Sequence, residues 1–140
     1  MRHMLDTNIV SHLFKRHPEV VSRMTCMAPG EVCISSITEA ELLYGADKKK
    51  SSRLKETILA FLNTITICDW DSDAAATYGE LRAATYGELR AAMEKKGKVM
   101  GDLDQLIAAH ALSRGTTIVT NDRAFRMVQE LAVEDWTTTS

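Results

Sequence analysis

The chain has 140 residues, enough for one domain with a substantial core, because a domain of this size buries roughly 68–70% of its unfolded surface. A composition of 45% hydrophobic and 26% charged residues is typical of soluble globular proteins, and a net charge of −2 indicates no particular partner. No apolar run reaches the roughly 20 residues that span a bilayer, and the first residues lack the long apolar segment typical of a secretory signal, so we expect none. We therefore expect one cytoplasmic domain over residues 1–140, without a membrane segment.

Predicted strands and helices alternate along the chain. Short apolar and β-branched runs predict strands at 2–6, 32–35, 65–68, 116–119 and 131–134. Apolar residues at helical spacing, with flanking capping residues, predict helices at 9–16, 18–27, 38–46, 52–64, 72–95, 102–113 and 123–129. This alternation indicates an α/β fold of parallel β-α-β units, with helices on both faces of the sheet.

The predicted helix 72–95 contains an exact tandem copy, because residues 77–84 recur unchanged as residues 85–92. A unit of eight residues is too short for a repeat architecture, so we interpret it as a local duplication. In a helix it adds about 12 Å and rotates the later residues by about 80°. Either the helix protrudes or one copy loops out, and Gly79 and Gly87 each weaken the helix by about 1 kcal/mol.

The three cysteines are odd in number and have no CxxC spacing. Cys26, Cys33 and Cys68 lie in or beside apolar segments. We interpret them as reduced, mostly buried thiols, which is typical of a cytosolic protein.

Two acidic residues follow predicted strands, where sites form in open α/β sheets. Asp6 ends the first strand, and its neighbours Thr7 and Asn8 are able to orient it by hydrogen bonds. Asp122 follows a later strand, and Thr120 beside it can bond a carboxylate or a phosphate. Asp is also a favoured N-cap residue, so capping is the alternative for both acids.

The helix predicted from residue 38 offers two acids that the local pattern does not separate. Thr38 and Glu41 match a capping box, and Ser36 and Glu39 match the same pattern two residues earlier. If the earlier pair forms the cap, Glu41 is free to face a site.

The segment before the predicted helix 102–113 contains two further acids. Asp102 and Gln105 match a capping box, so we expect Asp102 at the N-cap and Asp104 at the second helical position. The helix dipole favours an anion there even without a metal ion. His110, within this helix, is interpreted as packed or partly exposed rather than catalytic.

Convergence of these acids would require a cation, because carboxylates in one cleft repel each other and lose solvation together. A hard divalent ion bound by oxygen ligands is the simplest solution, and it indicates a metal-dependent phosphodiesterase. The acids in question are Asp6, Glu41, Asp104 and Asp122.

Basic residues gather in two places in spite of the negative net charge. One group comprises Lys48, Lys49 and Lys50 with Arg53 and Lys55, and the other comprises Lys95, Lys96 and Lys98. Either group is suited to hold phosphates near the acids, and solvated helix ends are the alternative.

Four segments of the chain resemble, in order, the motifs of PIN-domain ribonucleases. They are residues 5–8 (LDTN), residues 35–45 (SSITEAELLYG), residues 101–112 (GDLDQLIAAHAL) and residues 118–125 (IVTNDRAF). The resemblance covers essentially the whole chain except the duplication. It is closest to the VapC toxins of bacterial type II toxin–antitoxin modules.

The resemblance implies a fold, a site and partners. It implies a three-layer α/β/α domain with a mostly parallel sheet of four or five strands. It implies a catalytic quartet of Asp6, Glu41, Asp104 and Asp122, which resolves the choice at Glu41. Mg²⁺, with Mn²⁺ as the alternative, is assigned to Asp6, Glu41 and Asp104, and substrate contacts are assigned to Asn8, Thr120, Lys48, Lys49 and Lys50.

The enterobacterial members nearest in pattern are implied to cut initiator tRNA in its anticodon stem-loop, which inhibits translation. VapC proteins are implied to form homodimers and to be held inactive by a VapB antitoxin whose tail occupies the groove near the acids. The duplication departs from this pattern, since the helices beside it help build those partner surfaces.

Two alternatives remain open. One is a PIN-like protein that the duplication has inactivated and that only binds its antitoxin. The other is a phospho-accepting receiver module, which needs a lysine at a late strand end. The strand 116–119 is followed instead by Thr120, Asn121 and Asp122, which disfavours the receiver.

Overall fold

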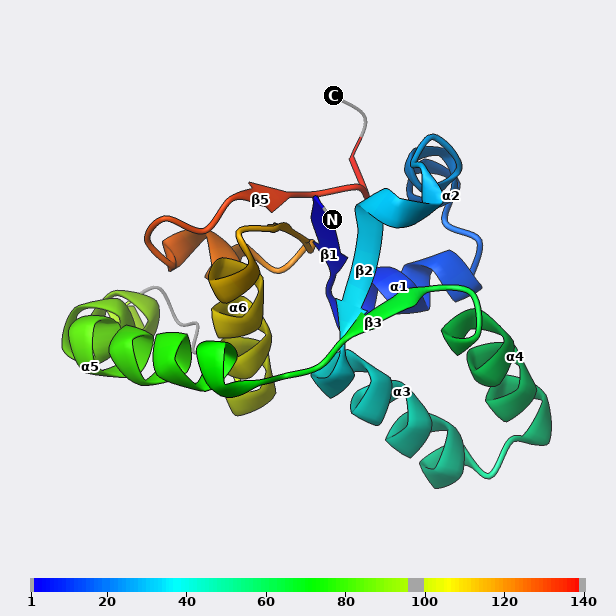
Figure 1. Ribbon diagram of the computed structural model, residues 1–140, viewed down its shortest axis with the longest axis horizontal. Helices are drawn as coiled ribbons and strands as arrows, with labels where there is room; N and C mark the ends of the chain where they lie inside the picture. The colour runs from blue at the N-terminus through cyan, green and yellow to red at the C-terminus, as the bar shows by residue number, and fades with distance from the viewer. Residues whose placement is uncertain (1, 96–99, 139–140) are drawn as a thin grey trace.

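The computed structural model describes residues 2–95 and 100–138, with the side chains of all of these except 84–95. A central sheet separates two layers of helices (Figure 1). The strands are β1 (His3–Leu5), β2 (Val32–Ser35), β3 (Thr66–Cys68), β4 (Thr117–Val119) and β5 (Val133–Glu134). The helices are α1 (Thr7–Phe14), α2 (Pro18–Thr25), α3 (Ser36–Lys49), α4 (Ser52–Leu62), α5 (Ser72–Lys95) and α6 (Asp102–Arg114), with 3₁₀ turns η1 (Pro29–Glu31) and η2 (Arg123–Met127).

The five strands are ordered β3-β2-β1-β4-β5, and each neighbouring pair is parallel. β1 is central, with His3 opposite Val32 of β2 on one side and Thr117 of β4 on the other. Because the strands are parallel, their carboxyl ends meet at one edge. β2 and β4 lie on opposite sides of β1, so the strand order reverses its direction at β1. Binding sites of open α/β sheets form at such a reversal, outside the carboxyl ends of the strands.

Apolar side chains fill both faces of the sheet, as expected for parallel strands covered on both sides. In β1, Met4 joins the core beneath α5 and α6, whereas Leu5 joins the core beneath α1 to α4. Both side chains are at most 1% exposed. Successive side chains of β1 thus point to opposite faces of the sheet and pack into both cores. This packing holds β1 in place, and Asp6 follows directly after it.

The predicted α/β/α architecture is confirmed, and the differences are at the element ends. The helix predicted for 38–46 begins at Ser36 and continues to Lys49, because Gly45 sits in open space and does not interrupt it. The helix from Asp102 ends at Gly115, whose φ of 65° is a left-handed conformation that glycine adopts without strain.

Helix α5 runs without a break through both copies of the duplicated octapeptide, so neither copy loops out. It packs alongside α6 (Figure 1). With a rise of about 1.5 Å per residue, its 24 residues extend roughly 36 Å, against about 20 Å for the 13 residues of α6. The duplication is therefore accommodated as extra helix length.

The thiols match the prediction at two of three positions. Cys33 and Cys68 are buried, but Cys26, at the end of α2, is exposed, contrary to our expectation. Burial and the neighbouring Cys68 raise the pKa of the Cys33 thiol to about 12. Within the described part of the chain, no helix has the length and hydropathy needed to cross a membrane.

Candidate active site

Asp6 occupies the carboxyl end of the central strand and is 1% exposed. The backbone N–H of Thr7 donates to its Oδ1 at 2.8 Å, and the hydroxyl of Thr120 donates to its Oδ2 at 2.8 Å. The first contact makes Asp6 the N-cap of α1, so the capping interpretation is correct. The second contact comes from the end of β4, so both oxygens of the carboxylate are held in place.

The pKa of Asp6 is raised from its ordinary value of 3.8 to about 7, chiefly because the carboxyl group is buried. Repulsion from Asp104 and Glu41 adds to the effect, against the opposing hydrogen bonds from Thr120 and Thr7. Acids from three separate segments therefore lie close enough to act on one another.

Glu41 faces this group of acids from α3. The hydroxyl of Thr7 donates to Glu41 Oε1 at 2.6 Å and lies 3.2 Å from the hydroxyl of Thr38. This contact joins α1 to α3. It identifies Glu41, rather than Glu39, as the acid on the site side, in agreement with the family resemblance.

Neither predicted capping box forms at the start of α3. Ser35 is the N-cap, and its hydroxyl accepts from the N–H of Ile37 at 3.1 Å. The hydroxyl of Ser36 accepts instead from the N–H of Trp70 at 3.0 Å. The cap thus stands one residue before Ser36 and three before Thr38, the two candidates from the sequence, and Glu41 is left free for the site.

Asp104 lies in the first turn of α6. The N-cap is Gly101 and not Asp102, so the predicted cap is again displaced by one residue. Burial, with added repulsion from Asp122 and Glu41, raises the pKa of Asp104 from 3.8 to about 6. Gly101 is close by, because a Cβ built on it would lie 3.8 Å from Asp104 Oδ2.

Asp122 follows β4 and caps η2, where its Oδ1 accepts from the N–H of Ala124 at 2.9 Å. Its own N–H donates to the hydroxyl of Thr120 at 3.0 Å. The buried Thr120 hydroxyl therefore connects Asp122 to Asp6. The structure confirms that Thr120 bonds a carboxylate, although nothing in it tests a contact with substrate.

The four predicted acids thus gather at the carboxyl ends of the strands. As they stand, no three His, Cys, Asp or Glu side chains among the described residues are arranged to hold a metal ion. The chemistry of the donor set nevertheless suits a hard divalent ion, because carboxylates offer only oxygen and a bound cation would offset their mutual repulsion. The metal site stays a prediction.

The predicted substrate residues are placed differently from one another. Asn8 is exposed in the first turn of α1, and in the described structure Thr120, rather than Asn8, bonds Asp6. Lys49 lines a pocket of about 340 Å³ that also includes Thr7 and Glu41. Lys48 and Lys50 are exposed and do not line that pocket, and the predicted basic residues Lys96 and Lys98 lie outside the described residues.

This pocket, between α1, α3 and α4, is mostly apolar, although Ser11, Lys15 and Lys49 line it as well as Glu41. Its apolar side chains come from all three helices and include Phe14, Leu42, Leu54 and Ile58. The pocket therefore brings apolar side chains and two lysines, Lys15 and Lys49, together with Glu41.

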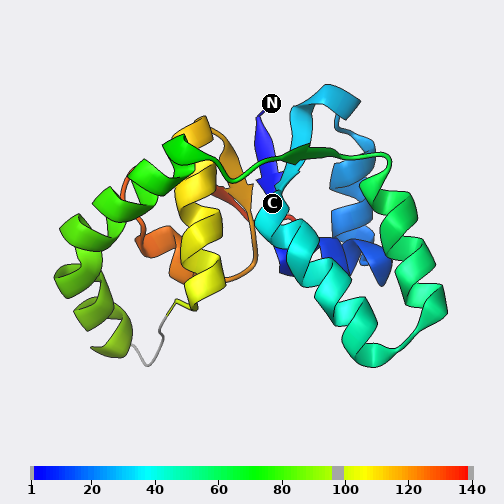
Figure 2. The same ribbon diagram turned by 60° about the horizontal axis from the view of Figure 1, so that its bottom comes forward.

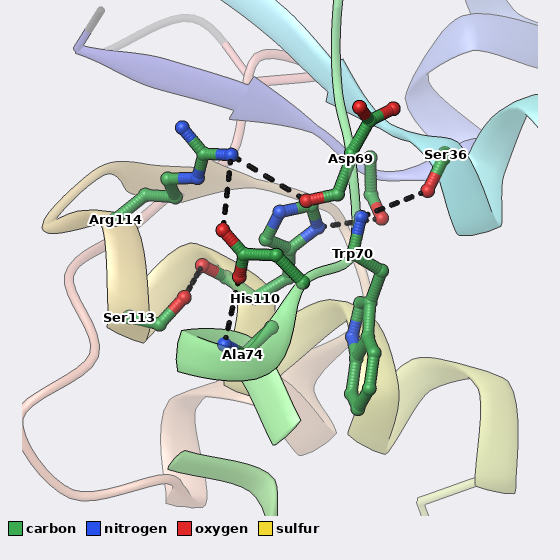
Figure 3. A network of polar contacts seen from close by, with 9 residues as sticks. Ser36, Asp69, Trp70, Ala74, His110, Ser113 and Arg114 are labelled. Atoms are coloured by element: carbon green, nitrogen blue, oxygen red, sulfur yellow. Dashed lines mark hydrogen bonds and ion pairs between the residues drawn. The ribbon is translucent and has the colours of Figure 1, made fainter. Parts of the chain in front are cut away.

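A buried polar network, which the sequence did not reveal, connects two of the acid-bearing helices (Figure 3). His110 of α6 is 0% exposed, and its Nδ1 lies 2.7 Å from the hydroxyl of Ser35, the N-cap of α3. Burial, with a smaller effect from Arg114, lowers the pKa of His110. The network fixes α6, which carries Asp104, against α3, which carries Glu41.

Arg114 completes the network at the end of α6 (Figure 3). Its guanidinium group lies 3.7 Å from the carboxylate of Asp71 and donates to the backbone carbonyl of Asp69 at 3.4 Å. These contacts hold the segment between β3 and α5 against α6. His110 is therefore packed inside the protein, as the sequence indicated, and it has a structural partner that only the fold reveals.

Known proteins resemble the chain along almost its whole length. Residues 3–131 match the PIN domain family. Ribonuclease VapC2 of Haemophilus influenzae is 41% identical over 139 residues, which are 97% of this chain and 98% of that protein. The tRNA(fMet)-specific endonuclease VapC of Shigella flexneri is 40% identical over 138 residues, with the same coverage.

Solved structures give the same result. The DNA-bound VapBC of Salmonella typhimurium contains a chain with a TM-score of 0.80 and 36% identity, covering 97% of this chain and 98% of its own. VapBC2 of Rickettsia felis, bound to a DNA fragment from its promoter, gives a TM-score of 0.79 and 33% identity, covering 97% and 99%.

Ser35→Ala is expected to destabilise the protein more than the matched cap variant Ser51→Ala. Both remove a hydroxyl that caps a helix, which costs about 1 kcal/mol. Only Ser35→Ala also leaves the buried His110 without this partner, which adds roughly 1–3 kcal/mol. Urea unfolding at pH 8 measures the difference, and equal losses for the two variants would contradict the proposed connection.

Wild-type protein is expected to lose stability in metal-free buffer as the pH rises from 5 to 8. The pKa of Asp6 is about 7 in the folded protein, above the ordinary value of 3.8. Between these two pH values the folded state therefore binds more protons at Asp6 than the unfolded state does. The protonated Asp6 side chain contributes fully to the free energy of unfolding below about pH 4, and this contribution is lost as the pH rises through 7. Between pH 5 and 8 the free energy of unfolding falls by roughly 3 kcal/mol at most.

The control for this pH dependence is Asp6→Asn, which does not titrate at this position. His110, whose depressed pKa makes stability fall toward acid pH, contributes equally to both proteins. Urea unfolding at several pH values gives the comparison. If the two proteins show the same pH dependence, the raised pKa of Asp6 is wrong.

Proposed function

The chain belongs to the PIN-domain family and to its VapC group, and on that premise we propose that it is a toxin endoribonuclease of a toxin–antitoxin pair. The observation that carries the proposal is the meeting of Asp6, Glu41, Asp104 and Asp122 at the carboxyl ends of the strands, where each of two acids has a pKa raised partly by its neighbours. Four clustered carboxylates are unsuited to bind a polyanion by themselves. They suit a centre that brings a cation to a phosphodiester.

Initiator tRNA, cut in its anticodon stem-loop with loss of translation, is the substrate we propose. Support comes from the names of relatives, since the VapC proteins of Shigella flexneri and Salmonella typhimurium are described as tRNA(fMet)-specific endonucleases. These relatives are 40% and 36% identical to this chain over nearly its full length.

Asp6, Glu41 and Asp104 are the residues we assign to hold Mg²⁺, or Mn²⁺ in its place. Such an ion supplies Lewis-acid polarisation of the phosphoryl group and activation of a water molecule for attack. The chain itself supplies orientation. Thr120 and the N–H of Thr7 fix the carboxylate of Asp6, and the Thr7 hydroxyl fixes that of Glu41.

Asp122 completes the negative charge of the centre from the side of β4. It is tied to Asp6 through Thr120, so the two acids keep a constant relation to each other. Lys49, at the margin of the pocket that contains Glu41, is placed to attract the phosphates of an approaching RNA strand.

A VapB-type antitoxin is the protein partner we propose, in keeping with the VapBC complexes among the similar structures. The apolar pocket of α1, α3 and α4 suits the tail of such a partner, because an apolar segment bound there would end beside Glu41. We further propose a cytoplasmic homodimer. The added length of α5 is the feature of this chain that would alter a dimer or antitoxin surface.

Asp6→Asn is expected to abolish Mg²⁺-dependent cleavage of initiator tRNA, with activity reduced at least about a hundredfold, because the change removes charge with little change of shape. The assay compares cleavage in Mg²⁺ with cleavage in EDTA. Asp102→Asn, at an exposed neighbour of Asp104, is the control and is expected to keep activity. Retained cleavage by Asp6→Asn would rule out the assigned centre, and no cleavage by the folded wild type would favour a non-catalytic binding protein.

Neutralising Lys48, Lys49 and Lys50 together is expected to weaken RNA binding and to flatten its dependence on salt. Each lost phosphate contact reduces the slope of log affinity against log salt by about 0.7–0.9. Binding of tRNA in increasing KCl measures the slope. An unchanged slope would show that these lysines form a solvated surface only.

A further inference from the structure

We propose that a second pocket, beside the acids and lined by Arg123 and Arg126, binds a backbone phosphate of the RNA next to the scissile one. The inference rests on the proposed function. It adds a substrate subsite on the side of β4, away from the lysines of α3 and from the apolar pocket of α1, α3 and α4.

The pocket has a volume of about 400 Å³ and is mostly polar. Its lining residues are Thr120, Asn121, Arg123, Arg126, Asp135 and Thr138. Its lining residues follow the carboxyl ends of β4 and β5, which places it at the same edge of the parallel sheet as the acids.

Helix geometry directs both arginines into this pocket. Arg123 and Arg126 are three residues apart in η2, a 3₁₀ helix, in which side chains at i and i+3 lie one above the other. Both side chains are exposed. Among the residues that the structure describes, neither guanidinium group is paired with a carboxylate, so both retain donors for a ligand.

Positive charge exceeds negative charge in the pocket. Asp135 is its single acidic lining residue, and the carboxylate of Asp135 already accepts from the N–H of Thr137 at 2.8 Å and from the Thr137 hydroxyl. Two guanidinium groups with paired donors match the oxygens of a phosphate. The ligand class is therefore an anion with several oxygens.

The position of the pocket identifies the anion as part of a nucleic-acid strand. Thr120 lines the pocket and also donates to Asp6, so the pocket adjoins the acids through a single residue. Glu41 follows β2 and the arginines follow β4, on opposite sides of β1 in the sheet. A strand that crosses Asp6 would bring phosphates to both sides, toward Lys49 and toward the arginines.

The test measures binding of a labelled initiator tRNA transcript in increasing KCl with Mg²⁺ present. The reference protein is Asp6→Asn, so that cleavage does not interfere. Arg123→Gln and Arg126→Gln are added together, and the matched control adds Arg2→Gln instead. Arg2 is exposed and pairs weakly with Glu31 at 4.0 Å. It precedes β1 and therefore lies at the amino ends of the strands, opposite to the end that carries the acids.

We expect the double arginine change to weaken binding roughly tenfold in dilute salt and to reduce the salt slope by about 1.4–1.8, the value for two phosphate contacts. The Arg2 control is expected to match the reference. In the chain with its acids intact, the same double change is expected to raise KM for cleavage with little change in kcat.

Three other results would overturn the subsite. Equal salt slopes for all proteins, with cleavage by the wild type preserved, would remove the subsite and leave the proposed function standing. Loss of antitoxin binding with unchanged RNA binding would assign the pocket to the protein partner. Absence of both RNA binding and cleavage in the wild type would defeat the proposed function itself, and the subsite with it.

Discussion

The burial of one carboxylate at the end of the central strand is the constraint on which this structure depends. Asp6 is held between the N–H of Thr7 and the hydroxyl of Thr120, and other acids approach it from α3 and α6. Charge in such a place is costly, because it loses water without gaining a positive partner. The fold sustains this cost through the two apolar cores that meet at β1.

Topology explains how acids far apart in the sequence come together. Asp6 and Asp122 end neighbouring parallel strands, while Glu41 and Asp104 lie in the helices that pack on either side of the sheet (Figure 2). Each acid is introduced by a different β-α unit, so convergence needs the correct strand order but no unusual backbone. A site of this kind tolerates a longer α5, since the duplicated residues contribute none of its acids.

Much of the fold and site was predictable because it rests on local signals. Alternating strands and helices gave the architecture, and a strand end gave Asp6. The caps expected at Ser36 or Thr38 and at Asp102 were misplaced for a common reason, since neighbouring Ser, Thr and Asp positions each satisfy the same local pattern. The pairing of Ser35 with His110, 75 residues apart, has no local signal at all, and neither does the bond from Thr7 to Glu41.

Ser35 illustrates what that distant pairing implies. One oxygen atom at the end of β2 both starts α3 and meets the imidazole of α6. The separation between Glu41 and Asp104 is therefore not adjustable by moving one helix alone. A substitution that loosens the contact between Ser35 and His110 would change the positions of Glu41 and Asp104 relative to each other. The geometry of the acidic centre therefore depends on Ser35, although its hydroxyl contacts none of the four carboxylates.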